Sequence, residues 1–239
     1  MRITRENIIN FSVDDVLNSL LWLESNHKKS VFDARTFEIA RWIYEKYGIS
    51  TTYNCFYESD RGSLTGVSDR FRDEIEDSAF LLFSFHGRNA ETDYGKSDYD
   101  CASADYRLTV HELKRIAGAK SISDILRIHL YRANEDVVKA LGDLGVQMLL
   151  TADDDRGSYD LSIKEEQRAR EGIYQRDTGV VKKYLATDIR LELFSIDQIS
   201  SVYTKRDRPI VVFTHEHLLM LDETKKKLDL LFTHVLGER

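Results

Sequence analysis

The sequence predicts an α/β fold whose parallel strands close, or nearly close, into a barrel. Short apolar runs alternate along the chain with amphipathic segments of helical spacing, which is the pattern of βα units around a parallel sheet. About seven of these runs have the character of strands, and that number favours a barrel over an open sheet. The 239 residues suit one α/β barrel better than two domains, so we expect a single domain over residues 1–239.

Local patterns place the elements. Strands are expected over residues 8–13, 49–57, 79–86, 124–131, 146–151, 185–194 and 209–215. Helices are expected over residues 32–46, 68–76, 108–116, 135–144, 195–202 and 223–236. Gly48 and Gly118 are suited to end two of these helices, and Asn134 is suited to begin another. The long polar loop over residues 88–106 is expected to be a lid that faces the substrate.

Composition limits the class of partner. The formal net charge of −7 argues against a general binder of nucleic acid or membrane surfaces. No apolar run approaches the roughly 18 residues of a transmembrane helix, and the charged residues 1–6 do not form an apolar leader. Cys55 and Cys101 form neither a metal motif nor a disulfide framework. We therefore expect a cytoplasmic protein without a nucleic-acid or membrane partner, whose oligomeric state the sequence leaves open.

Four predicted strands end at residues that can carry chemistry. The carboxyl ends of parallel strands share one mouth of a barrel, so these side chains should meet there. They are Asp14 and Asp15 on the first strand, His86 on the third, Arg127 and His129 on the fourth, and His215 on the last. Taken singly, the Asp pair could cap a turn, and a buried His could have a purely structural role, held by hydrogen bonds. Their recurrence at four strand ends favours a functional site.

These residue types together indicate metal-assisted hydrolysis. Carboxylates and imidazoles are typical ligands of Zn²⁺ and comparable divalent cations. Such an ion lowers the pKa of a bound water from near 16 toward about 7, which makes the water a nucleophile at neutral pH. A neighbouring carboxylate can act as general base, an Arg can keep it ionised, and a second His can protonate the leaving group.

Short motifs at the same strand ends resemble those of a known family. The motifs are Phe11-Ser12-Val13-Asp14-Asp15, Phe83-Ser84-Phe85-His86, Arg127-Ile128-His129-Leu130-Tyr131 and Phe213-Thr214-His215. In this order they resemble the NodB-type polysaccharide deacetylases, carbohydrate esterases with a distorted (β/α)7 barrel. The resemblance spans most of the chain and implies that barrel here, with a divalent metal at its mouth. The metal would be Zn²⁺, with Co²⁺, Ni²⁺ and Mn²⁺ as alternatives.

The resemblance also implies a role for each residue. Asp14 would be the catalytic base, braced by Arg127, and His215 would be the general acid. Asp15 and His86 would bind the metal. The family's second His ligand follows the first by four residues, and that position is Ala90 in this sequence.

His129 is our candidate for the missing ligand, because period-two alternation on the fourth strand places it on the same face as Arg127. The proline that usually follows the bracing Arg of the family is also absent.

The preferred hypothesis is a metal-dependent hydrolase of the polysaccharide-deacetylase type. It would remove an acyl group from an N-acylated sugar or a glycan precursor, including a nucleotide- or lipid-linked one. The replacement of the second His motivates a second hypothesis, a catalytically silent barrel that binds a carbohydrate or a sugar nucleotide. A third is a metal-dependent hydrolase of another ester or amide. Metal content separates the first from the second, and a substrate screen separates the first from the third.

Overall fold

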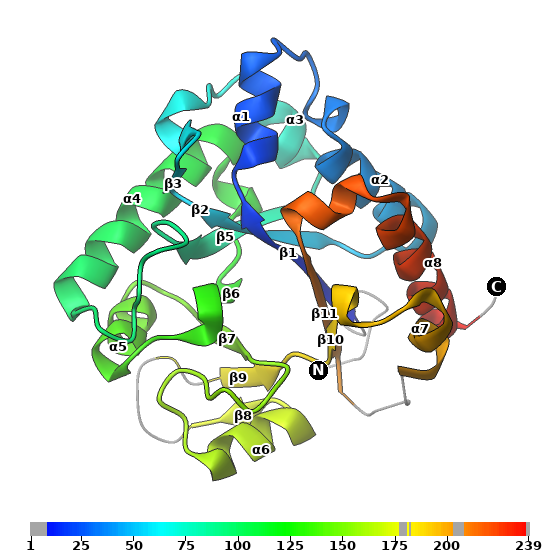
Figure 1. Cartoon of the computed structure of the whole chain (residues 1–239). Helices are drawn as coiled ribbons and strands as arrows, with labels where there is room; N and C mark the ends of the chain where they lie inside the picture. The colour runs from blue at the N-terminus through cyan, green and yellow to red at the C-terminus, as the bar shows by residue number, and fades with distance from the viewer. Residues whose placement is uncertain (1–8, 177–180, 182, 203–207, 238–239) are drawn as a thin grey trace.

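The computed structural model describes residues 9–176, 181, 183–202 and 208–237. The charged residues 1–6, for which the sequence predicts no leader, lie outside this part. The strands are β1 (Ile9–Val16), β2 (Thr51–Phe56), β3 (Glu58–Ser59), β4 (Gly62–Ser63), β5 (Leu81–Gly87), β6 (Ile125–Leu126), β7 (Met148–Thr151), β8 (Tyr174–Gln175), β9 (Lys183–Ala186), β10 (Ile189–Arg190) and β11 (Ile210–His215). The helices are α1 (Asn18–Ser25), α2 (Arg35–Tyr47), α3 (Arg72–Asp77), α4 (Tyr99–Ala117), α5 (Glu135–Asp143), α6 (Ile163–Glu171), α7 (Ile196–Val202) and α8 (Asp222–Leu236) (Figure 1).

Two sheets of mostly parallel strands join to form a distorted barrel. One has the order β10-β11-β1-β2-β5 and the other β6-β7-β9-β8. They meet on one side where Phe83 of β5 bridges in parallel to Ile122, just before β6. They meet on the other side where the chain passes from β9 to β10, and there the amide of Thr187 donates to the carbonyl of Thr151 in β7 at 3.1 Å. With β9 and β10 counted as one position, the described parallel strands take seven positions around the barrel, and the predicted fold class is confirmed.

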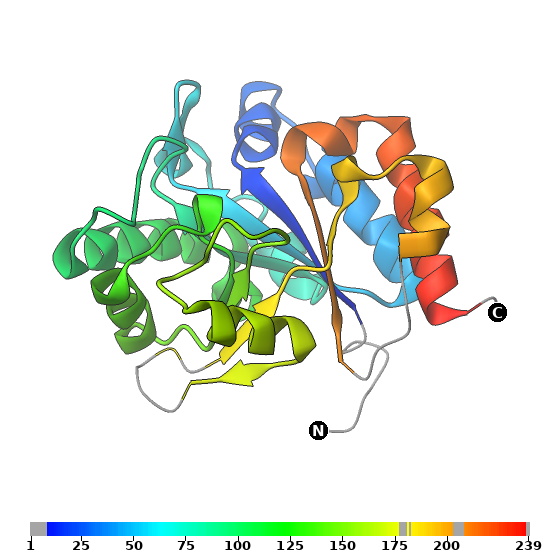
Figure 2. The ribbon, with the colours of Figure 1, turned by 60° about the horizontal axis from the view of Figure 1, so that its bottom comes forward.

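Helices cover the outside of the barrel on both flanks. Figures 1 and 2 show α2 and α8 side by side on one flank and α4 and α5 on the other. The hydroxyl of Tyr47 in α2 donates to the carbonyl of Asp229 in α8 at 3.1 Å. Every residue of β2 is buried, as expected of a parallel strand covered on both faces. No helix in the described part of the chain is both long enough and apolar enough to cross a lipid bilayer.

The predicted helix ends are present. Gly48 follows α2 with φ of +69°, a left-handed conformation that glycine adopts without steric cost. The side chain of Asn134 accepts a hydrogen bond of 3.0 Å from the amide of Val137, and so caps α5. Short-range sequence signals were sufficient at both positions because the interactions are local.

The predicted lid over residues 88–106 is wrong in its second half. Helix α4 begins at Tyr99, and the side chain of Asp98 caps it by accepting a hydrogen bond of 2.8 Å from the amide of Cys101. Ala102 and Tyr106 then belong to the buried core beside α5. The acidic, aromatic composition of this stretch concealed an amphipathic helix.

The fourth predicted strand, over residues 124–131, is also much shorter than expected. Pairing is limited to β6, and residues 129–131 form a single 3₁₀ turn. Leu130 and Tyr131 have φ of +56° and +59°, and this left-handed backbone cannot continue a strand. Likewise, the predicted strand over residues 185–194 ends at β10, and a 3₁₀ turn over residues 191–193 follows it.

Candidate metal centre

An irregularity at the end of β1 places two neighbouring carboxylates in the same mouth. Successive residues of a strand point to opposite faces, so a regular strand would separate Asp14 from Asp15. The pairing of β1 with β2 shifts register between Val13 and Val16, and Asp15 has φ of +62°. A bulge of this kind turns a side chain toward a site, and left-handed backbone at a non-glycine residue is typical of functional positions.

Asp14 belongs to a buried ion pair. Its Oδ1 accepts hydrogen bonds from a guanidinium NH1 of Arg127 at 2.9 Å and from Asn54 Nδ2 at 2.6 Å. Arg127 is 1% exposed, and its guanidinium also donates to Ser12 at 2.8 Å and to Thr187 at 3.2 Å. These donors hold the Asp14 carboxylate in one orientation at the carboxyl end of β1. The predicted contact between Asp14 and Arg127 is therefore present.

Three ligand-type atoms converge beside this pair. Asp15 Oδ1 lies 3.2 Å from His86 Nε2 and 3.5 Å from His129 Nδ1, and the two ring nitrogens lie 3.3 Å apart. A tetrahedral Zn²⁺ site with bonds of about 2.0–2.2 Å has edges of about 3.3–3.6 Å between its ligand atoms. The triangle formed by Asp15, His86 and His129 therefore has the size of one face of such a tetrahedron, which leaves the fourth position open.

Hydrogen bonding around His86 favours a cation within this triangle. His86 Nδ1 lies 2.6 Å from the carbonyl oxygen of Arg127. A carbonyl only accepts, so Nδ1 carries the proton, and in the neutral ring Nε2 directs a lone pair at Asp15. Asp15 Oδ1 is buried and no well-aligned hydrogen bond reaches it. Facing lone pairs repel unless a proton or a metal ion lies between them, so the three residues fit a divalent cation.

The surroundings of Asp15 keep it ionised. Burial alone would raise the pKa of its carboxyl, but without a cation the rings of His129 and His86, which then direct N–H groups and positive charge at Asp15, outweigh burial and hold the pKa well below its usual value. A metal ligand of this type must be deprotonated to bind. Asp15 is therefore in the binding form throughout the neutral range.

His215 lies at the end of β11 and has a carboxylate partner that sequence reasoning missed. Its Nδ1 lies 2.6 Å from Glu192 Oε1. Burial would lower the pKa of His215, but the hydrogen bond and the charge of Glu192 outweigh it and raise the pKa above its usual value. Glu192 is the second residue after β10, so a carboxylate just past a strand end was the available signal.

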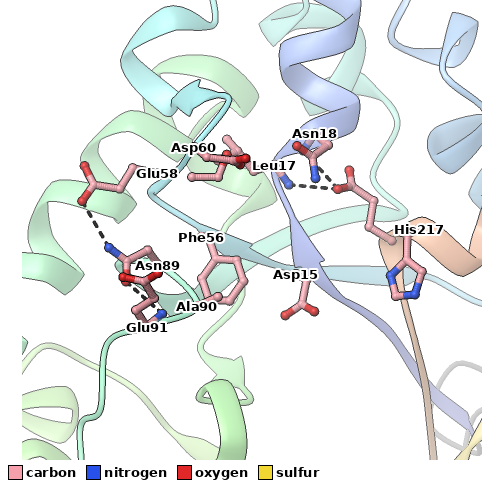
Figure 3. Close-up of a pocket in the computed structure, with 12 residues that line it drawn as sticks. Asp15, Leu17, Asn18, Phe56, Glu58, Asp60, Asn89, Ala90, Glu91 and His217 are labelled. Carbon is pink, nitrogen blue, oxygen red and sulfur yellow. Dashed lines mark hydrogen bonds between the residues drawn. The ribbon is translucent and has the colours of Figure 1, made fainter.

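The position of the family's second His opens into a cavity of about 700 Å³. Ala90 lines it and carries no ligand, so the third candidate ligand comes from the turn after β6. Figure 3 shows Asp15 at the cavity between Phe56 and His217. The acidic residues Glu58, Asp60 and Glu91 line the cavity as well, and no Lys or Arg of the described residues lines it.

Glu216 also lines this cavity, but its carboxylate is already hydrogen-bonded to backbone amides. It accepts hydrogen bonds from the amides of Asn18 at 3.0 Å and Ser19 at 2.7 Å, at the first turn of α1. Leu17, at the N-cap position, provides no side-chain cap. Glu216 therefore caps α1 from the turn after β11 and so joins the end of β1, which carries Asp15, to the turn that carries His217.

The fold is that of the polysaccharide deacetylases of family CE4, and the likeness indicated by the sequence motifs is confirmed at this level. A proposed polysaccharide deacetylase from Mycobacterium smegmatis aligns with a TM-score of 0.57 and 11% sequence identity, over 98% of this chain and 86% of the other. A CE4 family pseudoenzyme from Bacillus anthracis aligns with a TM-score of 0.50 and 10% identity, over 97% of this chain and 61% of the other.

The same barrel also occurs within a longer protein that is named for a different activity. A 4-alpha-glucanotransferase from Thermococcus litoralis aligns with a TM-score of 0.59 and 13% identity, over 96% of this chain and 38% of the other. The sequence matches no family model and no curated protein. Identities this low establish the fold alone, so the activity must be argued from the side chains at the barrel mouth.

Proposed function

We propose that the protein is a metal-dependent hydrolase that removes an acyl group from an N-acylated sugar. One observation carries the proposal: the triangle of Asp15, His86 and His129 lies beside the buried pair of Asp14 and Arg127. A cation site next to a fixed carboxylate provides both a Lewis acid and a proton acceptor. When bound, a divalent cation would polarise the acyl carbonyl and acidify a water molecule.

The protein's own residues then move the protons. Asp14 takes a proton from the attacking water as the water oxygen bonds to the acyl carbon. Arg127 and Asn54 hold the Asp14 carboxylate and leave it little freedom to turn away. The protonated His215 donates its proton to the sugar nitrogen as the carbon–nitrogen bond breaks. The products are a carboxylic acid and an amine, and Glu192 supports the donor by favouring the protonated imidazole.

The charges around the cavity favour a neutral or amine-bearing sugar. Glu58 is paired with Arg88 at 2.8 Å, whereas Asp60 and Glu91 have no cationic partner among the described residues. A phosphate of a nucleotide- or lipid-linked precursor would meet these carboxylates without a compensating cation. Phe56 also lines the cavity, but it is 6% exposed and its ring packs against those of His86 and His129, so it supports the candidate ligands. We therefore favour an uncharged N-acetylated oligosaccharide over a phosphate-linked precursor.

A catalytically silent carbohydrate-binding barrel is the second candidate. The absence of a His at Ala90 and the fold shared with a pseudoenzyme support it. In that case the His129 turn would have no role in metal binding.

A cytoplasmic location stays a prediction, with which the free thiols of Cys55 and Cys101 agree.

Metal analysis with matched variants tests the proposal. Purified protein loaded with Zn²⁺ and dialysed should retain close to one ion per chain, while His86→Ala and His129→Ala should each lose most of it. His111→Ala is the control, because that ring is on the surface with 76% of its side chain exposed. Wild-type protein that retains no Zn²⁺, Co²⁺, Ni²⁺ or Mn²⁺ would favour the silent barrel.

A substrate screen tests the chemistry. Acetate release should be measured from a neutral N-acetylated oligosaccharide, a partly deacetylated one, and a nucleotide-linked N-acetyl sugar, with simple aryl esters as a further class. We expect turnover of the first two and little of the third. Turnover of the aryl esters alone would point to a hydrolase of another ester or amide.

A further inference from the structure

A tyrosine side chain lies beside the candidate base but has no assigned role in the reaction above. Tyr131 is at the end of the 3₁₀ turn that begins with His129, and it is 3% exposed. Two guanidinium groups lie near its ring, with the Cζ of Arg127 6.0 Å and that of Arg156 5.6 Å from the ring centroid. Since Arg127 is also bonded to Asp14, Tyr131 is placed next to the acid–base machinery.

The hydroxyl of Tyr131 is buried and has no hydrogen-bond partner among the described residues. Buried hydroxyls are nearly always hydrogen-bonded, and an orphan destabilises the folded state. Neither neighbouring guanidinium group bonds to it. Arg127 donates to Asp14, Ser12 and Thr187 while its Nε is itself unpaired, and Arg156 donates to Asp154. Stacking against cations would explain a ring at this position, but it would not explain the hydroxyl.

A neighbouring tyrosine provides the contrast. Tyr159 is 1% exposed, and its amide donates to the carbonyl of Tyr131 at 3.1 Å. Its hydroxyl donates to the carbonyl of Leu150 at 2.8 Å and accepts from the amide of Ile128 at 3.3 Å. The same region of the barrel therefore satisfies one buried tyrosine hydroxyl completely and leaves the other free.

The backbone holds Tyr131 in place at a cost. Both Leu130 and Tyr131 have positive φ, a conformation that is a genuine outlier for bulky residues and persists where the surrounding structure enforces it. The same turn positions His129 against Asp15. One strained turn thus places a candidate metal ligand against Asp15 and the Tyr131 ring beside Arg127, the partner of Asp14.

We propose that Tyr131 contacts the substrate, its hydroxyl donating a hydrogen bond to an oxygen atom of the bound N-acylated sugar. This inference rests on the function proposed above, and it gives a role to Tyr131, the last residue of the Arg127–Tyr131 motif, to which the resemblance assigned none. A phenol is neutral at pH 7 and donates one hydrogen bond. The ligand oxygen would complete the hydrogen bonding that the protein alone leaves incomplete.

Paired phenylalanine variants test the inference on two independent readouts. Tyr131→Phe should raise the midpoint of thermal unfolding of the ligand-free protein by about 2–4 °C, because it removes a buried group with no partner. It should also lower kcat/KM for a neutral N-acetylated oligosaccharide by roughly 2- to 12-fold, the value of one neutral hydrogen bond. Tyr159→Phe should do the opposite, lowering the unfolding midpoint by a similar amount and leaving kcat/KM within about twofold.

The outcomes separate this inference from the proposed function. If the wild type hydrolyses the oligosaccharide while Tyr131→Phe keeps the wild-type kcat/KM, the inference is wrong and the function stands. A Tyr131→Phe protein that unfolds at a lower temperature would show that the hydroxyl has a structural partner, and it would also overturn the inference. If the wild type neither binds the oligosaccharide by calorimetry nor releases acetate, the proposed function fails and the inference fails with it.

Discussion

Removal of Arg127 should destabilise the whole barrel, whatever the activity. Its guanidinium lies between the two sheets, bonded to Ser12 and Asp14 of β1 and to Thr187 between β9 and β10. Arg127→Met keeps most of the side-chain volume but leaves the Asp14 carboxylate, which is 2% exposed, without its counter-charge. Breaking a buried pair in this way costs about 3–5 kcal/mol. For a domain of this size, that corresponds to a decrease of roughly 6–20 °C in the unfolding midpoint.

Denaturant unfolding followed by circular dichroism measures this loss. The double variant Asp14→Asn with Arg127→Met should recover part of the stability, because no unpaired charge is then buried. Arg107→Met, at an exposed position of α4, is the control and should stay within about 0.5 kcal/mol of the wild type. An Arg127→Met protein as stable as this control, or a double variant less stable than Arg127→Met, would refute the view that the pair joins the sheets.

Three further predictions concern the mouth of the barrel. Asp14→Asn should lower kcat by about 10²–10⁴-fold, the contribution of a general base, with bound metal close to the wild-type level; full turnover would exclude Asp14 as the base. Asp15→Asn should instead lose the metal, as measured after dialysis, because it removes a charged ligand. Glu192→Gln should move the alkaline limb of kcat to lower pH, since Glu192 raises the pKa of His215 and the general acid is lost as pH rises through that pKa. The stability that the His215–Glu192 pair contributes should be complete below a pH of about 6.5 and should be lost as the pH rises through the raised pKa of His215. Glu45→Gln, at an exposed position of α2, is the control. A Glu192→Gln profile that matches this control would contradict the role of Glu192.

The sequence alone was sufficient for the barrel and for most residues at its mouth. Buried parallel strands are continuous apolar runs, so a polar residue at the end of each run is visible without a structure. Asp14, Asp15, His86 and His215 were found in this way. Helix ends such as Gly48 were equally visible, because capping depends on residues that are close in sequence.

Tertiary structure decided how those residues meet. His129 was selected by strand alternation, yet the strand stops at β6, and it is the turn with left-handed Leu130 and Tyr131 that brings His129 to Asp15. The pairing of Glu192 with His215 and the orphan hydroxyl of Tyr131 could not be recognised, since a partner, or the absence of one, is a property of residues distant in the chain. Local patterns report which face of an element is buried, but the distance between two side chains depends on bulges and turns whose conformation the surrounding structure imposes.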